Sequence, residues 1–198
     1  DCLLSRGLGD VYKRQVYADD FIAGFQYPWE AERFYEQLRS RMAKFGLELE
    51  ENKSRIVESG RYLASLKAKR GESTRLGTFD FLGFTFYCGR TTKGNPWIMP
   101  KTSSKKFRQK VKEIKIWLYN NKEQKLGKLM YMLNVKLVGH YRYYGISFNS
   151  RMISNYKQQV RELLYKVLNR RSEKKSYTRE GFIEMMKYYK LVNHKIYY

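Results

Sequence analysis

Apolar residues recur every three or four positions through the second half of the chain, which is the spacing of one face of an α-helix. We expect three long amphipathic helices from Ser103 onwards, packed through these faces, with Asn149 and Ser150 capping the third. A shorter fourth helix is expected to follow its N-cap, Thr178. The four stripes are Phe107, Val111, Ile114 and Leu118; Leu126, Leu129, Leu133, Leu137 and Tyr141; Met152, Tyr156, Val160, Leu163 and Val167; and Phe182, Met185 and Tyr189.

The beginning of the chain mixes strand and helix patterns. Residues 16–25 alternate weakly between apolar and polar and predict a strand–turn–strand about Asp19 and Asp20. Pro28 suits the first turn of a helix, and Gly46 is placed to end that helix. Its apolar face is expected to consist of Ala31, Phe34, Leu38, Met42 and Phe45.

Extended segments are expected from residue 47 to residue 99. Leu47 and Leu49 alternate with glutamates and predict a short strand, residues 55–57 predict a further extended piece, and residues 67–77 predict a loop. The aromatic segment 79–99 predicts a hairpin in which Gly83 marks a bulge or a close backbone approach. The fold class is therefore α+β, a small antiparallel sheet with a helix followed by an all-helical bundle.

Positive charge is concentrated in the helical half. The 198 residues carry a net charge of +21; residues 101–198 hold 24 Lys and Arg against 6 Asp and Glu, whereas residues 1–100 hold 16 against 13. The 18 tyrosines interleave with basic residues, and their rings either stack on unpaired bases or lie half-buried with a wet hydroxyl. We therefore expect the second half to bind a polyanion.

Other classes of site find little support in the sequence. Cys2 and Cys88 are the only cysteines, which gives no disulfide framework and indicates a reducing compartment. His140 and His194 have no Cys or His at ligand spacing, which argues against zinc. The chain has no run of 18 apolar residues and no signal-peptide pattern, so no membrane partner is expected.

The adjacent carboxylates of Asp19 and Asp20 are the candidate catalytic groups. Nucleotidyl transfer uses Mg²⁺ ions held by carboxylates, which stabilise both the attacking and the leaving oxygen. Because adjacent residues on a strand point to opposite faces, a turn is needed to bring both carboxylates near the metal. By spacing alone, a plain hairpin turn accounts for these residues better.

The chain from Tyr17 to Ile196 resembles the reverse transcriptase–maturase proteins encoded by group II introns. Its first segments resemble palm motifs and a primer grip, and two later ones resemble the family's thumb, or maturase, domain, which general polymerases lack. The matching segments are Tyr17-Ala18-Asp19-Asp20-Phe21, residues 45–49 with Asn52-Lys53-Ser54, residues 79–84, residues 139–145 (GHYRYYG) and residues 168–172 (LNRRS).

The resemblance implies an RNA-directed DNA polymerase that also binds intron RNA and assists its splicing and mobility. Its cofactor would be Mg²⁺, and its partners intron and template RNA, a DNA primer or target and dNTPs, in the bacterial cytoplasm near the nucleoid. A solvated turn lysine stays open as an alternative for Lys53. The implied site residues are Asp19 and Asp20 for metal and catalysis; Tyr17, Ala18 and Lys53 for the nucleotide; Phe81, Leu82 and Gly83 for the primer end; and Lys105, Lys106, Arg108, His140, Tyr141, Arg142, Tyr144, Arg170, Arg171, Lys174 and Lys175 for nucleic acid.

The chain is expected to divide near residue 100. Residues 1–15 resemble a translated sequencing-adapter read, residues 16–100 the C-terminal part of a polymerase palm with its primer-grip hairpin, and residues 101–198 the thumb/maturase domain. Arg179 stands where the family usually has Trp, and residues 192–194 replace a Pro-containing tail, which leaves open how the final helix and tail are held.

Three other classes of protein remain as alternatives. The first is a non-enzymatic RNA-binding splicing maturase with a vestigial palm. The second is the reverse transcriptase of a retron or diversity-generating element, against which residues 168–172 argue. The third is a basic helical DNA-binding protein in which the paired aspartates are accidental.

We expect residues 16–198 by themselves not to polymerise DNA. The resemblance implies a third metal-binding aspartate upstream of Tyr17, together with much of the nucleotide pocket. A primer-extension assay on the purified chain with Mg²⁺ and dNTPs checks this expectation, and clear incorporation would refute it.

Overall fold

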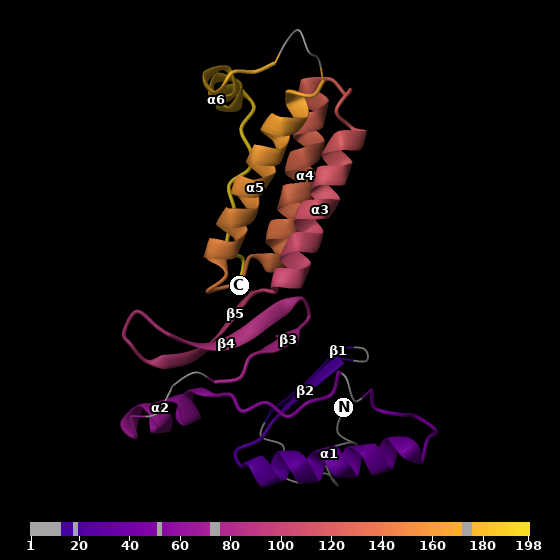
Figure 1. Ribbon diagram of the computed structural model, residues 1–198, viewed down its shortest axis with the longest axis vertical. Helices are drawn as coiled ribbons and strands as arrows, with labels where there is room; N and C mark the ends of the chain where they lie inside the picture. The colour runs from indigo at the N-terminus through magenta and orange to yellow at the C-terminus, as the bar shows by residue number, and fades with distance from the viewer. Residues whose placement is uncertain (1–12, 18–19, 51–52, 72–75, 172–175) are drawn as a thin grey trace. The chain divides into compact units, whose positions relative to one another are not determined.

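The chain forms a small sheet followed by helices, which confirms the expected α+β class (Figure 1). The computed structural model describes residues 13–17, 20–50, 53–71, 76–171 and 176–198. The chain divides into two units, the first made of residues 1–82 and 87–98, the second of residues 83–86 and 99–198.

The first unit begins with a hairpin and a helix. Strand β1 (Lys13–Tyr17) pairs antiparallel with β2 (Asp20–Gly24), and Tyr17 lies opposite Asp20. Helix α1 (Pro28–Ala43) follows, with Pro28 in its first turn as predicted. The Glu30 carboxylate accepts a hydrogen bond from the Tyr27 backbone amide at 3.2 Å, which satisfies one of the free donors at the helix start.

Helix α1 ends at Ala43, three residues before the glycine predicted to end it, and its apolar face is shorter than predicted. Gly46 has a φ of +67°, and the next residue, Leu47, donates its amide to the Met42 carbonyl at 3.0 Å. Phe34 is buried against Phe25, with ring centroids 5.1 Å apart. Phe45, by contrast, is 72% exposed, so it does not belong to the buried face.

Two predictions for the middle of the first unit are wrong. Residues 47–49 form no strand, because within the described part of the chain they join no ladder, and alternation alone cannot satisfy backbone groups. Helix α2 (Arg61–Lys69) occupies the start of the predicted loop 67–77. It buries Ala64, and it follows Gly60, whose φ is +128°.

The aromatic segment forms a sheet of order β3-β4-β5, with β3 at Phe79–Phe81, β4 at Phe84–Arg90 and β5 at Pro96–Thr102. Leu82 and Gly83 join β3 to β4, and their φ values of 48° and 79° are those of a two-residue turn that matches strand twist. Gly83 is therefore a turn residue rather than a bulge. The predicted close approach is confirmed, since a Cβ there would lie 3.2 Å from the Tyr144 hydroxyl.

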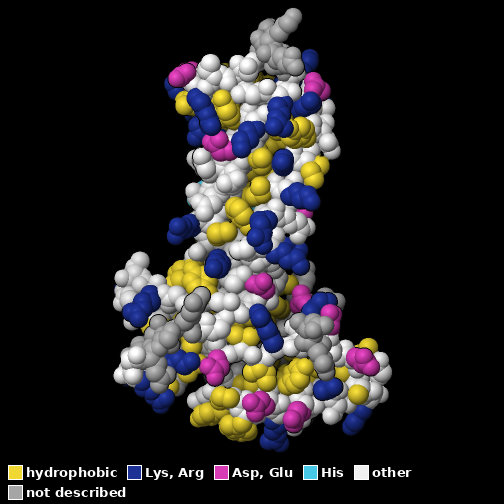
Figure 2. Space-filling view, viewed as in Figure 1, with side chains coloured by type: hydrophobic (Ala, Val, Ile, Leu, Met, Phe, Trp, Pro, Cys, Tyr) yellow, Lys and Arg dark blue, Asp and Glu magenta, His cyan; other side chains and the backbone are white. Residues whose placement is uncertain are grey.

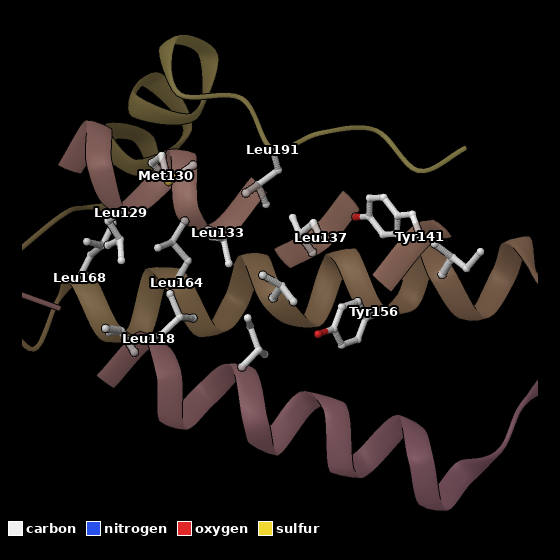
Figure 3. Packing of buried hydrophobic residues seen from close by; sticks show 14 of the residues in the cluster. Leu118, Leu129, Met130, Leu133, Leu137, Tyr141, Tyr156, Leu164, Leu168 and Leu191 are labelled. Carbon is white, nitrogen blue, oxygen red and sulfur yellow. The ribbon is translucent and has the colours of Figure 1, made fainter. Parts of the chain in front are cut away.

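The second unit is built around a continuous apolar core. Helices α3 (Ser104–Asn120), α4 (Leu126–Tyr144) and α5 (Ser150–Leu168) lie side by side, and the shorter α6 (Arg179–Tyr188) follows (Figure 1). Figure 3 shows their leucines pointing towards one another between the helices. The fully buried aliphatic residues are Leu118, Leu129, Leu133, Leu137, Ile153, Val160, Leu164, Val167 and Leu168.

The α3 and α4 stripes are confirmed, whereas the α5 stripe is shifted. Met152 and Leu163, both predicted in the core, are only half-buried. Ile153 and Leu164, one position later in each case, have no exposed surface. Tyr156, Val160 and Val167 are common to both patterns, so the predicted face is rotated slightly from the true one.

The side chain of Asn149 joins three segments inside the second unit. Asn149 stands at the predicted N-cap of α5 but makes no cap bond there. Its Oδ1 instead accepts the Thr102 amide at 2.8 Å, and its Nδ2 donates to Thr102 Oγ1 at 2.9 Å and to the Tyr144 carbonyl at 2.8 Å. Because Asn149 is completely buried, these bonds fix the end of β5 against the α4–α5 junction.

The C-terminal segment runs back down the helical unit from α6 (Figure 1) and is held by α4. Asn134 holds it by two bonds, donating to the Lys190 carbonyl at 3.0 Å and accepting the Val192 amide at 2.9 Å. Further on, the Tyr197 amide donates to the Gly145 carbonyl at 2.7 Å. A Cβ on Gly145 would lie 2.6 Å from the Lys195 carbonyl, so this glycine is required for the close approach.

Helix α6 is capped as predicted, and Arg179 accounts for its first turn. The Thr178 hydroxyl accepts the Gly181 amide at 3.1 Å. The Arg179 guanidinium lies 4.3 Å from the Tyr165 ring centroid and pairs with Glu162 at 3.2 Å. Arg179 thus makes a cation–π contact with Tyr165, and this contact and the ion pair with Glu162 hold the first turn of α6 against α5.

His140 is stacked inside the aromatic end of the core. Its ring centroid lies 3.8 Å from that of Tyr156 and 4.7 Å from that of Tyr144. Burial of the imidazole, aided by the charge of Lys110, lowers the pKa of His140 to about 4. The ring is therefore neutral at physiological pH and acts as an aromatic packing group.

Replacing Leu164 with Ala should destabilise the protein more than replacing Leu163 with Ala. Leu164 is completely buried, so its loss leaves a cavity that costs about 2–5 kcal/mol, whereas the half-buried Leu163 should cost under about 2 kcal/mol. Denaturant unfolding of the two variants measures the difference. Equal losses would show that the assigned α5 face is wrong.

Acid should destabilise the protein through His140. In the unfolded chain the imidazole of His140 has its ordinary pKa of 6.5, whereas in the folded chain its pKa is about 4. Between these two pH values the unfolded state therefore binds more protons than the folded state. The free energy of unfolding should therefore fall by roughly 1–3 kcal/mol as the pH drops through this window. Thermal melts against pH measure this loss.

The matched variants for this test are His140→Phe and His194→Phe. His140→Phe keeps an aromatic ring but cannot be protonated, so its stability should depend less on pH between 6.5 and 4. His194→Phe keeps His140 and should retain the wild-type dependence. An unchanged slope in His140→Phe would exclude His140 as its source.

Candidate nucleic-acid interface

The hairpin that carries the paired aspartates is present in the structure. Tyr17 ends β1 and Asp20 begins β2, and the two residues are paired across the ladder. Ala18 and Asp19 lie outside the described residues, so the structure places one of the two predicted catalytic carboxylates. That carboxylate, Asp20, is exposed. The two strands on either side of the predicted turn are therefore paired as expected.

Lys53 lies within the electrostatic range of Asp20. Its ammonium donates a hydrogen bond to the Glu50 carboxylate at 2.5 Å, and this bond, with a smaller contribution from the charge of Asp20, raises the pKa of Lys53. Lys53 is fully charged and largely exposed. The partner of Lys53 is thus a neighbouring glutamate. This contact is compatible with a solvated turn lysine, and also with a lysine that binds a nucleotide phosphate.

The described residues supply one carboxylate of the predicted magnesium site. Carboxylate oxygens are the ligands that Mg²⁺ prefers, and Asp20 presents one such group to solvent. Across residues 13–17, 20–50, 53–71, 76–171 and 176–198, no three acidic, histidine or cysteine side chains come together at metal-binding distance. Asp20 alone does not make a metal site.

The segment predicted to press on the primer end forms the β3–β4 turn. Phe81 is the last residue of β3, and Leu82 and Gly83 form the turn itself. Leu82 adopts a left-handed conformation, with φ of 48°, which is uncommon for a side chain of its size. The Gly83 carbonyl accepts the Ser103 amide at 3.0 Å, so the turn is fixed to the start of α3.

The outer side of α3 carries four exposed cations in one row. Lys105, Arg108, Lys112 and Lys115 are separated by three, four and three residues, which puts them on one face over about 15 Å. None of the four has an ion pair among the described residues, because the one carboxylate of α3, Glu113, accepts bonds from Lys110 and Gln109. We call these four residues the α3 basic row.

The sequence prediction found half of this row. Lys105 and Arg108 were expected to contact nucleic acid, and Lys106, also expected, is exposed but lies on another side of the helix. Lys112 and Lys115 were missed. The sequence does contain the pattern that predicts them. Lys112 and Lys115 follow Lys105 and Arg108 at spacings of four and three, as the apolar residues of α3 do on a different face of the helix.

The GHYRYYG segment is mostly internal, which corrects three predicted contacts. His140, Tyr141 and Tyr144 are buried in the core, so their side chains cannot reach a nucleic acid on the surface. Burial also raises the pKa of Tyr141 to about 12. Arg142 is exposed and remains available. This segment therefore serves chiefly to pack α4 against its neighbours.

The LNRRS segment fastens the other end of the helical unit. The Asn169 side chain donates to the Tyr177 carbonyl at 3.1 Å and accepts the Tyr177 amide at 2.7 Å. Arg171 donates to the Gln124 carbonyl at 2.9 Å, and Arg170 lies over the Tyr119 ring and hydrogen bonds to its hydroxyl.

These contacts change the roles expected for the two arginines. Arg171 is half-buried and engaged within the chain, so a primary contact with nucleic acid is not supported by its position. Arg170 is exposed and can make a further contact while stacked on Tyr119. Lys174 and Lys175 lie outside the described residues.

Basic side chains surround apolar ones on the surface of the helical unit. Figure 2 shows Lys and Arg side chains on both sides of a line of apolar side chains there, with few acidic side chains between them. No described helix is long and apolar enough to cross a membrane. The arrangement of charge is that of a surface for a polyanion.

Comparison with known families supports the resemblance noted from the sequence. Residues 104–189 match the family model of the group II intron, maturase-specific domain. Neither the curated proteins nor the solved structures provide a match. The matched region runs from the start of α3 to the end of α6 and contains the fully buried aliphatic residues of the core, the α3 basic row, and the segments 139–145 and 168–172. Residues 104–189 therefore belong to the group II intron maturase-specific domain family.

Proposed function

We propose that the helical unit binds the RNA of a group II intron directly and thereby assists its splicing. The observation that carries this proposal is the α3 basic row, four exposed cations on one helix face that have no ion pair with any described residue. Phosphates on an RNA strand are repeated negative charges, and cations held in a row can neutralise several of them while releasing counterions. The excess of 24 basic over 6 acidic residues in 101–198 adds a long-range attraction.

A reverse transcriptase activity is the second part of the proposal. The observation in its favour is the β1–β2 hairpin, which pairs Tyr17 with Asp20, the first residue of β2. Asp19 and Asp20 would hold Mg²⁺, and the metal would supply charge stabilisation for the attack of a primer 3′-hydroxyl on a dNTP. Lys53 would act as a cation for the nucleotide phosphates, once released from Glu50.

The two parts are separable. RNA binding rests on the second unit, whereas polymerisation rests on the first, in which the described residues include one of the two predicted catalytic carboxylates, Asp20. A splicing factor without polymerase activity would keep the α3 basic row and would not need the aspartates. Binding measured without dNTPs therefore tests the first part alone.

Replacing Lys112 and Lys115 together with Ala should weaken binding to a transcribed group II intron RNA and lower its salt dependence. Each lost phosphate contact reduces the slope of log K against log salt by about 0.7–0.9, so the slope of the double variant should fall by about 1.4–1.8. Fluorescence anisotropy across a salt series measures both quantities. Because both side chains are exposed and their charges repel one another, the melting temperature should not fall.

The matched control is Lys187→Ala with Lys190→Ala, which removes the same charge from exposed positions on α6 and the segment after it. This control should keep the wild-type slope. If the two double variants lose equal affinity and slope, binding depends on total charge, and the assignment to the α3 basic row is wrong.

A further inference from the structure

The outward side of α4 is a second exposed surface, distinct from the α3 basic row. Five exposed residues follow one another on it at spacings of three and four, so they form a line of about 21 Å along the helix. We call them the α4 outer face: Lys128, Tyr131, Val135, Gly139 and Arg142.

Two neighbouring parts of the same unit border this face without covering it. On one side, Asn134 binds the C-terminal segment through the Lys190 carbonyl and the Val192 amide. On the other side, the Lys136 ammonium lies 5.1 Å from the ring centroid of Trp117 on α3. The face between these borders leaves Tyr131 71% exposed and Val135 56% exposed.

The chemistry of the face combines stacking surfaces with cations. Tyr131 and Val135 offer one ring and one apolar patch on adjacent turns, with Lys128 before them and Arg142 after them. Helix α4 contains no acidic residue along its 19 positions. Around Gly139 a side chain would meet nothing within 4 Å, so the backbone there is open to close approach.

We infer that the α4 outer face binds unpaired nucleotides of a looped RNA, a deepening that rests on the proposed RNA-binding function. Unpaired bases can stack on a tyrosine ring and an apolar neighbour, while their phosphates reach flanking cations. Paired bases are already stacked and hidden from such a ring, so a duplex would gain only from the cations. The absence of carboxylates from α4 fits a polyanion better than a protein surface of mixed charge.

The experiment compares two labelled RNAs on the full chain, a hairpin with an unpaired loop and a fully paired duplex with the same number of phosphates. Tyr131→Ala should weaken binding of the looped hairpin five- to tenfold, because a base loses its stacking surface. It should leave duplex binding and the melting temperature unchanged, since the ring is exposed. Tyr131→Phe, which keeps the ring, should bind both RNAs as the wild type does.

Tyr188→Ala is the matched control, because it removes another highly exposed tyrosine from α6 of the same unit. It should bind both RNAs normally. Equal effects of Tyr131→Ala and Tyr188→Ala, or equal losses on hairpin and duplex, would overturn the inference about α4 alone. Failure of the wild type to bind either RNA would instead overturn the proposed function.

Self-association gives the remaining outcome. If sedimentation shows that the wild type is a dimer and that Tyr131→Ala dissociates it, the α4 outer face is a protein interface, and the inference is wrong. A monomer in both cases, together with a loop-specific loss of affinity, supports it.

Discussion

The buried amide of Asn149 is the interaction on which the helical unit depends. Its oxygen and nitrogen bond the backbone and hydroxyl of Thr102 and the carbonyl of Tyr144, in a place that water does not reach. A single side chain thus sets how β5 enters α3 and where α4 turns into α5. Any shift of these segments would leave buried donors and acceptors unpaired, at a cost comparable to a large part of a domain's stability.

The motifs that identify the family serve the fold more than the contact with RNA. His140 and Tyr144 stack in the core, and Asn169 and Arg171 fasten backbone segments at the other end of the unit. Such residues are specified by close packing and by buried hydrogen bonds, which tolerate few substitutions. A surface that meets phosphates can instead be built from any well-spaced cations. Recognisable motifs therefore report the scaffold, and the binding surface has to be found from spacing and exposure.

Local periodicity predicted the helices well and their neighbours less well. Adjacent leucines at 163 and 164 give two apolar stripes that differ by one position, and only three-dimensional packing selects Leu164. The strand expected at Leu47 needed a partner strand, which alternation in one segment cannot reveal. Asn149 stands at the expected N-cap position, but its side chain does not bond the first turn of α5, because Thr102, a residue distant in the sequence, binds it instead. Errors thus arise where long-range contacts override local preference.

The helical unit carries its positive charge at an energetic cost that its core has to offset. Cations held in one row repel each other, and no acidic side chain in the described part of the chain pairs with the α3 basic row to relieve that repulsion. The leucine-rich core and the Asn149 bonds hold the helices together against it, so the cations can remain unpaired before any ligand arrives. A polyanion bound there relieves the repulsion and gains contacts at the same time.

The first unit lacks such a core: Phe34, Ala64 and Leu76 are its buried apolar residues among those described, while Leu47 and Ile56 are exposed. The physical basis for function is therefore stronger in the helical unit, where a rigid frame presents unsatisfied charge, than at the aspartate hairpin.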